Sequence, residues 1–178
     1  RLMGQLLAGK YGLTDEFIEY LHLFSPLHDI GKVGIPDSIL LKPGELDADQ
    51  WVIMRRHVTI GEEIIKKIGH ELDMHGDLAS RVMYNIVATH HERGDGSGYP
   101  RGLKMADIPL EGRIVAVADA YDALSNRRPY KKPWNESAVL QELRREAAKG
   151  RLDPDCVEAL LGAREARLLI AQRFADLA

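Results

Sequence analysis

Hydrophobic positions in this chain recur mostly three or four residues apart, and no segment shows the strict alternation of a half-buried strand. We therefore predict helices over about 1–11, 14–30, 47–68, 77–91, 110–126, 135–150 and 153–174. Short polar turns connect them, and a glycine-rich loop covers 92–102. The pattern predicts an all-α fold, a bundle of about seven helices.

Local signals mark where several of these helices start. Thr14 and Asn135 are predicted N-caps, because their side-chain oxygens can accept a hydrogen bond from the first turn. Asp47 followed three residues later by Gln50 resembles a capping box. Asp153-Pro154 combines a cap with a proline at the first helical position.

Three of the predicted helices carry apolar stripes that include histidine or end in it. The stripes contain Phe17, Leu21, Phe24 and His28; Ile53, His57, Ile60 and Ile64; Val82, Ile86 and His90; and Met83, Val87 and His91. A fourth helix carries Asp119 among apolar residues, with Asp122 on the same side. We interpret His22, His70 and His75, which lack this pattern, as surface residues.

A single histidine on an apolar stripe is usually a core residue whose ring nitrogens find hydrogen-bond partners. Several histidines with Asp29 and Asp119 are a different case, because burying many titratable groups is costly unless something satisfies them together. A divalent metal does so, since imidazoles and carboxylates are its usual nitrogen and oxygen ligands. The pattern therefore predicts a metal centre in the core.

Composition narrows the setting of this centre. The chain has 178 residues, 45% hydrophobic and 29% charged, which is typical of one globular domain. Its 24 basic and 27 acidic residues give a net charge of -3, which argues against a protein that binds DNA by charge alone. The single Cys156 excludes a cysteine-rich zinc site and favours a reducing, cytoplasmic location. No apolar run reaches the roughly 18 residues that would predict a membrane span.

The order of the motifs is similar to that of the HD-GYP domain, a bacterial branch of the HD metal-dependent phosphohydrolases. The similarity runs from about residue 2 to residue 161. The matching motifs are HDIGK at 28–32, His57 with Gly61, His90-His91-Glu92, Gly98-Tyr99-Pro100, DAYDAL at 119–124 and Arg128-Pro129-Tyr130-Lys131.

This resemblance implies an all-α HD domain that hydrolyses cyclic di-GMP (c-di-GMP) to pGpG, GMP or both, with two or three metal ions, most often iron or manganese. The implied metal ligands are His28, Asp29, His57, His90, His91 and Asp119, with Asp29 bridging. We assign catalytic roles to Lys32, Asp29 and Asp122, with Lys32 beside the reacting phosphate. The implied substrate-binding residues are Arg128, Lys131, Gly98, Tyr99 and Pro100.

Trinuclear members of this family resemble one another in having Glu and His on the helix before the HD pair, and nothing in 1–11 replaces them. We therefore expect two metals and leave a third open. Because the sequence begins at Arg1, we expect residues 1–178 to be one HD-GYP-type domain at the C-terminal end of a longer protein, after a regulatory domain.

Other functions stay open from the sequence. The domain could be a catalytically weak c-di-GMP sensor, or a module that docks a diguanylate cyclase (GGDEF) domain through the Gly98-Tyr99-Pro100 loop. It could also act on another cyclic nucleotide such as 3′3′-cGAMP. The last helix has an apolar face with Val157, Leu160, Leu161, Leu168 and Ile170, which we interpret as core packing, with a homodimer contact as the alternative.

Overall fold

The computed structural model describes residues 1–71, 73, 76–126 and 134–175, and in these ranges the chain is helical, with one isolated antiparallel bridge between Asp95 and Lys104. The all-α fold class is confirmed. The elements are α1 (Leu2–Tyr11), α2 (Asp15–Phe24), the 3₁₀ segment η1 (Ser25–Gly34), α3 (Asp37–Leu40), α4 (Ala48–Arg55), α5 (His57–Glu71), α6 (Leu78–Thr89), the 3₁₀ turn η2 (Met105–Asp107), α7 (Leu110–Ser125), α8 (Glu136–Ala148), α9 (Pro154–Gly162) and α10 (Arg164–Ala175).

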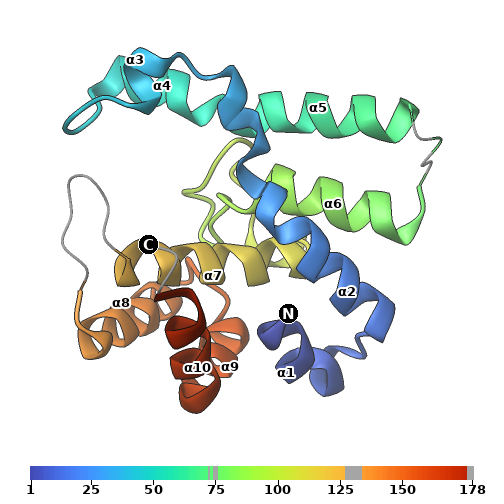
Figure 1. Cartoon of the computed structure of the whole chain (residues 1–178), viewed down its shortest axis with the longest axis vertical. Helices are drawn as coiled ribbons and strands as arrows, with labels where there is room; N and C mark the ends of the chain where they lie inside the picture. The colour runs from blue at the N-terminus through green and yellow to red at the C-terminus, as the bar shows by residue number, and fades with distance from the viewer. Residues whose placement is uncertain (72, 74–75, 127–133, 176–178) are drawn as a thin grey trace.

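Helix α6 lies at the centre of the molecule. It packs against α2, η1, α5 and α7, while α8 and α9 pack on α7, and α1 packs on α9. Figure 1 shows α5 above α6 and α7 below it, with α3 and α4 at the upper edge and α8 to α10 at the lower edge. Four elements therefore surround α6.

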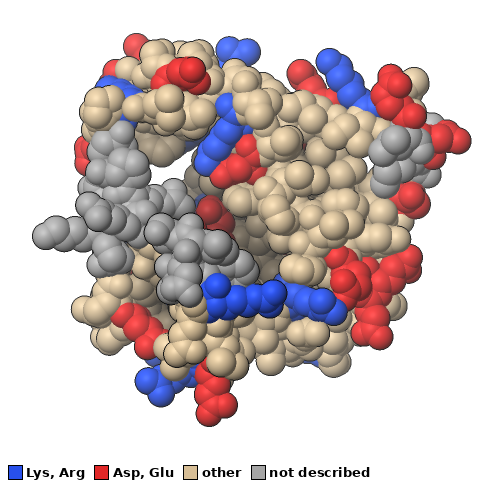
Figure 2. Space-filling view, viewed as in Figure 1, with Lys and Arg blue, Asp and Glu red and all other residues tan. Residues whose placement is uncertain are grey.

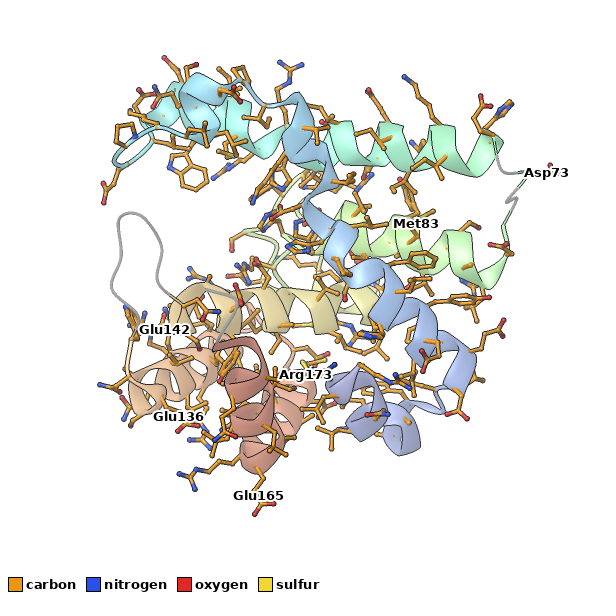
Figure 3. All side chains as sticks on the ribbon, in the orientation of Figure 1. Asp73, Met83, Glu136, Glu142, Glu165 and Arg173 are labelled. Atoms are coloured by element: carbon orange, nitrogen blue, oxygen red, sulfur yellow. The ribbon has the colours of Figure 1, made fainter. Side chains whose placement is uncertain are left out.

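The hydrophobic core has two parts. The larger one is built mainly from α1, α2, α6, α7, α8 and α9 and includes Leu21, Ile86, Val117, Leu143 and Val157. The smaller one, which contains Ile65, Met83 and Val87, fills the space between α5, α6 and η1. Figure 3 shows Met83 facing this space.

The predicted helix starts are confirmed. Thr14 accepts a hydrogen bond from the Phe17 backbone N–H at 3.2 Å, and Asn135 accepts one from Ala138 at 2.8 Å. Asp47 and Gln50 form the reciprocal capping box, and Asp153 caps α9.

Three predicted helices are each broken into two elements. The helix predicted over 14–30 becomes 3₁₀ after Phe24, where Pro26 lacks the backbone N–H that an α-helix would use. The helix predicted over 47–68 breaks at Arg56, and the one predicted over 153–174 breaks at Ala163. The described helices are therefore shorter and more numerous than predicted.

The break at Arg56 also changes which face of α5 is buried. His57, Val58, Gly61, Glu62, Ile65 and Gly69 are the buried residues of this helix. The predicted stripe is correct for His57, but Ile60 and Ile64 are only half-buried at its edge. A new helix axis begins at His57, so the periodicity that starts at Ile53 does not continue across the break.

Segment η1 crosses α5 at very short range. A Cβ atom on Gly31 would lie 1.8 Å from the carbonyl oxygen of His57 and 2.5 Å from the nitrogen of Gly61. Only glycine lets two backbones approach this closely. The HDIGK motif is therefore held against the helix that begins with His57.

Helix α10 differs from the prediction in its packing. Val157, Leu160 and Leu161 of α9 are buried as predicted, whereas Leu168 and Ile170 of α10 are 41% and 46% exposed. The turn at Ala163 redirects α10, so its apolar residues do not continue the face of α9. In the described part of the chain, no helix combines the length and apolar character needed to cross a membrane.

Candidate metal centre

Three segments that are distant in sequence bring ligand-type side chains to one point. Asp29 comes from η1, His57 from the first residue of α5, and His90 and His91 from the end of α6. One ligand atom from each of these four side chains lies within 4.8 Å of the others. Four of the six predicted metal ligands thus form one cluster.

The carboxylate of Asp29 faces imidazoles on both sides. Its Oδ1 lies 3.4 Å from Nε2 of His57 and 3.9 Å from Nε2 of His90. Its Oδ2 lies 3.3 Å from Nε2 of His28, and that nitrogen is 4.0 Å from Oδ1 of Asp119. The two remaining predicted ligands are therefore adjacent to the cluster, on the other side of Asp29.

Backbone carbonyls hold three of these imidazoles in one orientation. The Nδ1 atoms lie within hydrogen-bond distance of main-chain oxygens, in the pairs His28 with Ser25 at 2.8 Å, His57 with Met54 at 2.8 Å, and His90 with Ile86 at 3.1 Å. A proton on Nδ1 leaves the lone pair on Nε2, which is the atom that faces Asp29. Such carbonyl contacts commonly orient histidines that bind metals.

The atoms that face one another lack hydrogen-bond partners. Among the described residues, Oδ1 of Asp29 and Nε2 of His57 and of His90 are buried without one. Leaving such polar atoms unsatisfied is costly. A divalent cation would satisfy all three together, so the donor set fits a metal site.

At four of the six predicted ligands the electrostatics favour the protonation state that binds metal, whereas at His28 the effect of burial is outweighed by the hydrogen bond with Asp29 and by its charge, which raise the pKa of the imidazole. Burial lowers the pKa of His90 to about 3 and that of His91 to about 2, and it also lowers the pKa of His57. Burial works against the charge on Asp29, but hydrogen bonds with His28 and Lys32 hold its pKa well below the usual range. Neutral imidazoles and an ionised carboxylate are the forms that coordinate cations.

Lys32 lies at the same centre. Its ammonium group donates a hydrogen bond to Oδ2 of Asp29, three residues earlier in η1. A cation in this position compensates the carboxylate and cannot itself bind a metal.

The glycine-rich loop forms one wall of the centre. The ring of Tyr99 stacks on that of His91 with centroids 4.7 Å apart, and the Tyr99 N–H donates to the His91 carbonyl at 3.2 Å. Gly98 is required here, because a Cβ atom would lie 2.2 Å from the nitrogen of Arg93. Pro100 is exposed at the outer side of the loop.

Glu92 holds this loop in place, a role that the sequence patterns did not reveal. Its side chain is 2% exposed and accepts backbone hydrogen bonds from Arg101 at 2.7 Å and Leu103 at 2.9 Å. Arg101 in turn donates to the side chain of Glu62 on α5 and to the Ala88 carbonyl on α6. The sequence signal that could have revealed this role is the position of Glu92 directly after His90 and His91.

The other predicted site residues are less closely associated with the centre. Asp122 is exposed, and its Oδ1 accepts a hydrogen bond from Asn126 at 2.7 Å. Arg128 and Lys131 lie outside the described residues, as does His75. His22 and His70 are exposed, as predicted.

A recess of about 350 Å³ opens beside the centre. It is lined by Trp51, Arg55, His91, Arg93 and Tyr99. Figure 2 shows this face of the molecule hollowed below α3 and α4, with acidic and basic side chains beside the hollow. Trp51 and Arg55 belong to no motif that was singled out in the sequence.

Comparison with known proteins gives a family and several relatives. Residues 4–156 match the HD domain family. The chain is 49% identical over 156 residues, 87% of its length, to 3′3′-cGAMP-specific phosphodiesterase 2 of Vibrio cholerae. It is 48% identical over 160 residues, 89% of its length, to the cyclic di-GMP phosphodiesterase response regulator RpfG of Xanthomonas campestris, and 46% identical over 156 residues, 87% of its length, to a cyclic di-GMP phosphodiesterase of Thermotoga maritima. These matches span 28%, 40% and 40% of the three relatives.

Proposed function

The chain belongs to the HD domain family, in its HD-GYP branch, and from this premise we propose that it hydrolyses a phosphodiester bond of a cyclic dinucleotide, with c-di-GMP as the leading substrate. The products would be pGpG, GMP or both. The observation that supports this proposal best is the Asp29 carboxylate, which faces His57 and His90 with one oxygen and His28 with the other. A carboxylate shared in this way suits a pair of cations.

We propose two divalent ions, iron or manganese, at this centre. The ligands would be His28, Asp29, His57, His90, His91 and Asp119, with Asp29 bridging. When bound, such a pair neutralises the non-bridging phosphate oxygens and activates a water for in-line attack. A third metal stays outside the proposal, because the described residues before His28 include no further ligand at the cluster.

Protein side chains would do the rest of the chemistry. Lys32, bonded to Asp29, would stabilise the charge that grows on the departing ribose 3′-oxygen or donate a proton to it. Arg128 and Lys131 would bind substrate phosphate or guanine. Asp122, which is exposed on α7, would be a further catalytic side chain. Gly98, Tyr99 and Pro100 would shape the wall beside His91.

One experiment tests the activity and the metal together. The full-length protein, purified without oxygen, would be analysed for bound metals and then incubated with c-di-GMP, and the products would be separated by chromatography. We expect about two metals per chain and formation of pGpG or GMP. Bound metal without any cleavage of cyclic dinucleotides would contradict the proposed activity and leave a sensor or docking module.

A second substrate has specific support. A relative that is 49% identical is named a 3′3′-cGAMP-specific phosphodiesterase, so the same assay should include 3′3′-cGAMP. The ratio of the two kcat/KM values would identify the preferred substrate. Faster turnover of 3′3′-cGAMP would replace c-di-GMP in the proposal without changing the reaction.

The proposal also includes partners and location. We propose a cytoplasmic domain at the end of a longer chain with a regulatory domain, and docking of a GGDEF domain at the loop around Tyr99. A homodimer would use the exposed residues Leu168 and Ile170. Tyr99→Ala should weaken capture of a GGDEF protein in a pull-down, and unchanged capture would remove this partner.

A further inference from the structure

Two separate parts of the chain line the recess beside the metal centre. Helix α4 contributes Trp51 and Arg55, and the segment after α6 contributes His91, Arg93 and Tyr99. The hollow in Figure 2 lies below α4, and Figure 3 shows side chains of α4 directed toward it. The recess therefore connects α4 to the centre.

Ring contacts run from the centre to α4. Tyr99 stacks on His91 with centroids 4.7 Å apart, and the Arg55 guanidinium lies 5.1 Å from the centroid of the Tyr99 ring. A cation over an aromatic face is attracted to it, which favours this orientation of Arg55. The guanidinium is thus held in the recess rather than directed away from it.

Trp51 is an aromatic surface that the fold does not use. It is 47% exposed, and α4 has no buried residue at all. A large indole at the rim of a recess offers a flat face on which a nucleobase can stack. Packing of the core does not explain a tryptophan in this place.

The charges of the recess suit an anion. Arg55 and Arg93 supply two cations, and none of the five lining residues is acidic. Arginine donates to phosphate through a planar, bidentate group. Any cyclic dinucleotide with one phosphodiester at the metal centre must place its second phosphate and a base nearby.

We propose that this recess holds the nucleotide unit that is not being cleaved, with its base stacked on Trp51 and its phosphate bound by Arg55. The proposal rests on the proposed function, because it concerns the substrate of the same site. A volume of about 350 Å³ is near the lower end for small-molecule sites, so the recess suits one nucleotide unit rather than the whole substrate. Trp51 and Arg55 would then select dinucleotides over simpler phosphodiesters.

Kinetics with two substrates test this selection in the full-length protein. Trp51→Ala should raise the KM for c-di-GMP about ten-fold, from the usual contribution of a base–aromatic stack, while Trp51→Phe keeps most of the affinity. The preference for c-di-GMP over bis(p-nitrophenyl) phosphate, taken as the ratio of kcat/KM values, should fall by about the same factor. Arg55→Ala should likewise raise the KM for c-di-GMP and lower the preference for it.

Neighbouring exposed residues of the same region provide controls. Val52 is 65% exposed on α4, and Arg56 is an exposed arginine next to Arg55. Val52→Ala and Arg56→Ala should leave KM and kcat/KM unchanged for both substrates. The recess proposal is overturned if Trp51→Ala has as little effect as Val52→Ala. It is also overturned if Trp51→Ala lowers kcat/KM for both substrates by the same factor. In either case the proposed function stands.

Fluorescence tests the recess even without turnover. Within residues 1–178 the tryptophans are Trp51 and Trp134, so the difference in emission between a Trp134→Phe variant and a Trp134→Phe/Trp51→Phe variant of the full-length protein reports on Trp51. Titration with c-di-GMP should quench this emission, and Arg55→Ala should weaken the quenching. Absence of quenching would overturn the proposal, and quenching without cleavage would retain the recess and reject the hydrolase.

Discussion

The two ends of the α5–α6 helix pair carry histidines in opposite settings. At one end, His57 and His90 are buried and face Asp29. At the other end, His70 is exposed beside an open recess of about 520 Å³. The larger recess thus lies away from the cluster of ligand-type side chains, so size alone does not locate the chemistry.

The difference between the ends comes from a third element. Segment η1 crosses α5 at Gly31 and brings Asp29 to His57 and His90, whereas the described residues place no such crossing at the far end. Backbone carbonyls then orient the rings of His57 and His90. A helical histidine becomes a candidate ligand where another backbone delivers a carboxylate to it.

The strongest way to break this contrast is to remove the shared carboxylate. Asp29→Asn keeps the size of the side chain but removes its charge, so we expect loss of bound metal and at least a 1,000-fold loss of kcat, about 4 kcal/mol of transition-state stabilisation. Metal analysis and steady-state kinetics would measure both. Retained metal with full activity would exclude Asp29 as a bridging ligand.

The crossing itself can be disturbed at Gly31. Gly31→Ala places a Cβ atom against the backbone of α5, so we expect a loss of about 3 kcal/mol in the free energy of unfolding. Urea denaturation would measure the change. Gly9→Ala is the matched control, because a Cβ atom there meets nothing within 4 Å and should stabilise α1 by about 0.5–1 kcal/mol. Equal effects of the two variants would refute the close crossing.

A Lys32 variant can distinguish a role in catalysis from a role in metal binding at the end of the helix pair that carries His57 and His90. Lys32→Ala removes a cation that contacts Asp29 but cannot coordinate, so we expect kcat to fall about 100-fold while metal content stays intact. The measurement is kcat together with metal analysis of the same sample. Parallel loss of metal and turnover would assign Lys32 to the assembly of the site.

A Glu92 variant tests how much the hydrogen bonds of Glu92 to the glycine-rich loop contribute to stability. Glu92→Gln replaces one of the two acceptor oxygens by an amide that cannot accept from a backbone N–H, so we expect a loss of about 2 kcal/mol in the free energy of unfolding. Urea denaturation with near-ultraviolet circular dichroism would follow it. An unchanged midpoint would mean that the loop is held by other contacts.

The smallest effect is expected at the far end. His70→Ala should leave metal content and kcat unchanged and alter the free energy of unfolding by less than about 0.5 kcal/mol, because the side chain is exposed. The same metal, kinetic and denaturation measurements apply. A loss of bound metal in this variant would remove the contrast between the two ends.

Much of this contrast could be predicted from the sequence. His28, His90 and His91 stand at the ends of apolar stripes, which indicated that their side chains face the core. Asp119 lies on an apolar helix, which indicated a further ligand-type side chain. The caps at Thr14, Asn135 and Asp153 were also correct. These features are local, so periodicity and capping chemistry reveal them.

The rest depends on contacts between distant segments. The close crossing of η1 over α5 at Gly31 joins two segments that are distant in sequence, so no single helical pattern contains it. The role of Glu92 depends on a loop that returns eleven residues later at Leu103. Trp51 was missed because an exposed aromatic on a short helix without buried residues has no distinctive spacing.

The close crossing at Gly31 restricts how this scaffold can diversify. Because backbone meets backbone there, neither segment can slide or tilt without a collision, so the distance between Asp29 and His57 is nearly fixed for every descendant that keeps the glycine. Changes in cation preference should therefore arise first at Asp119, which comes from α7 and not from the segment that the crossing fixes. Directed evolution toward a different ion would best begin with that position.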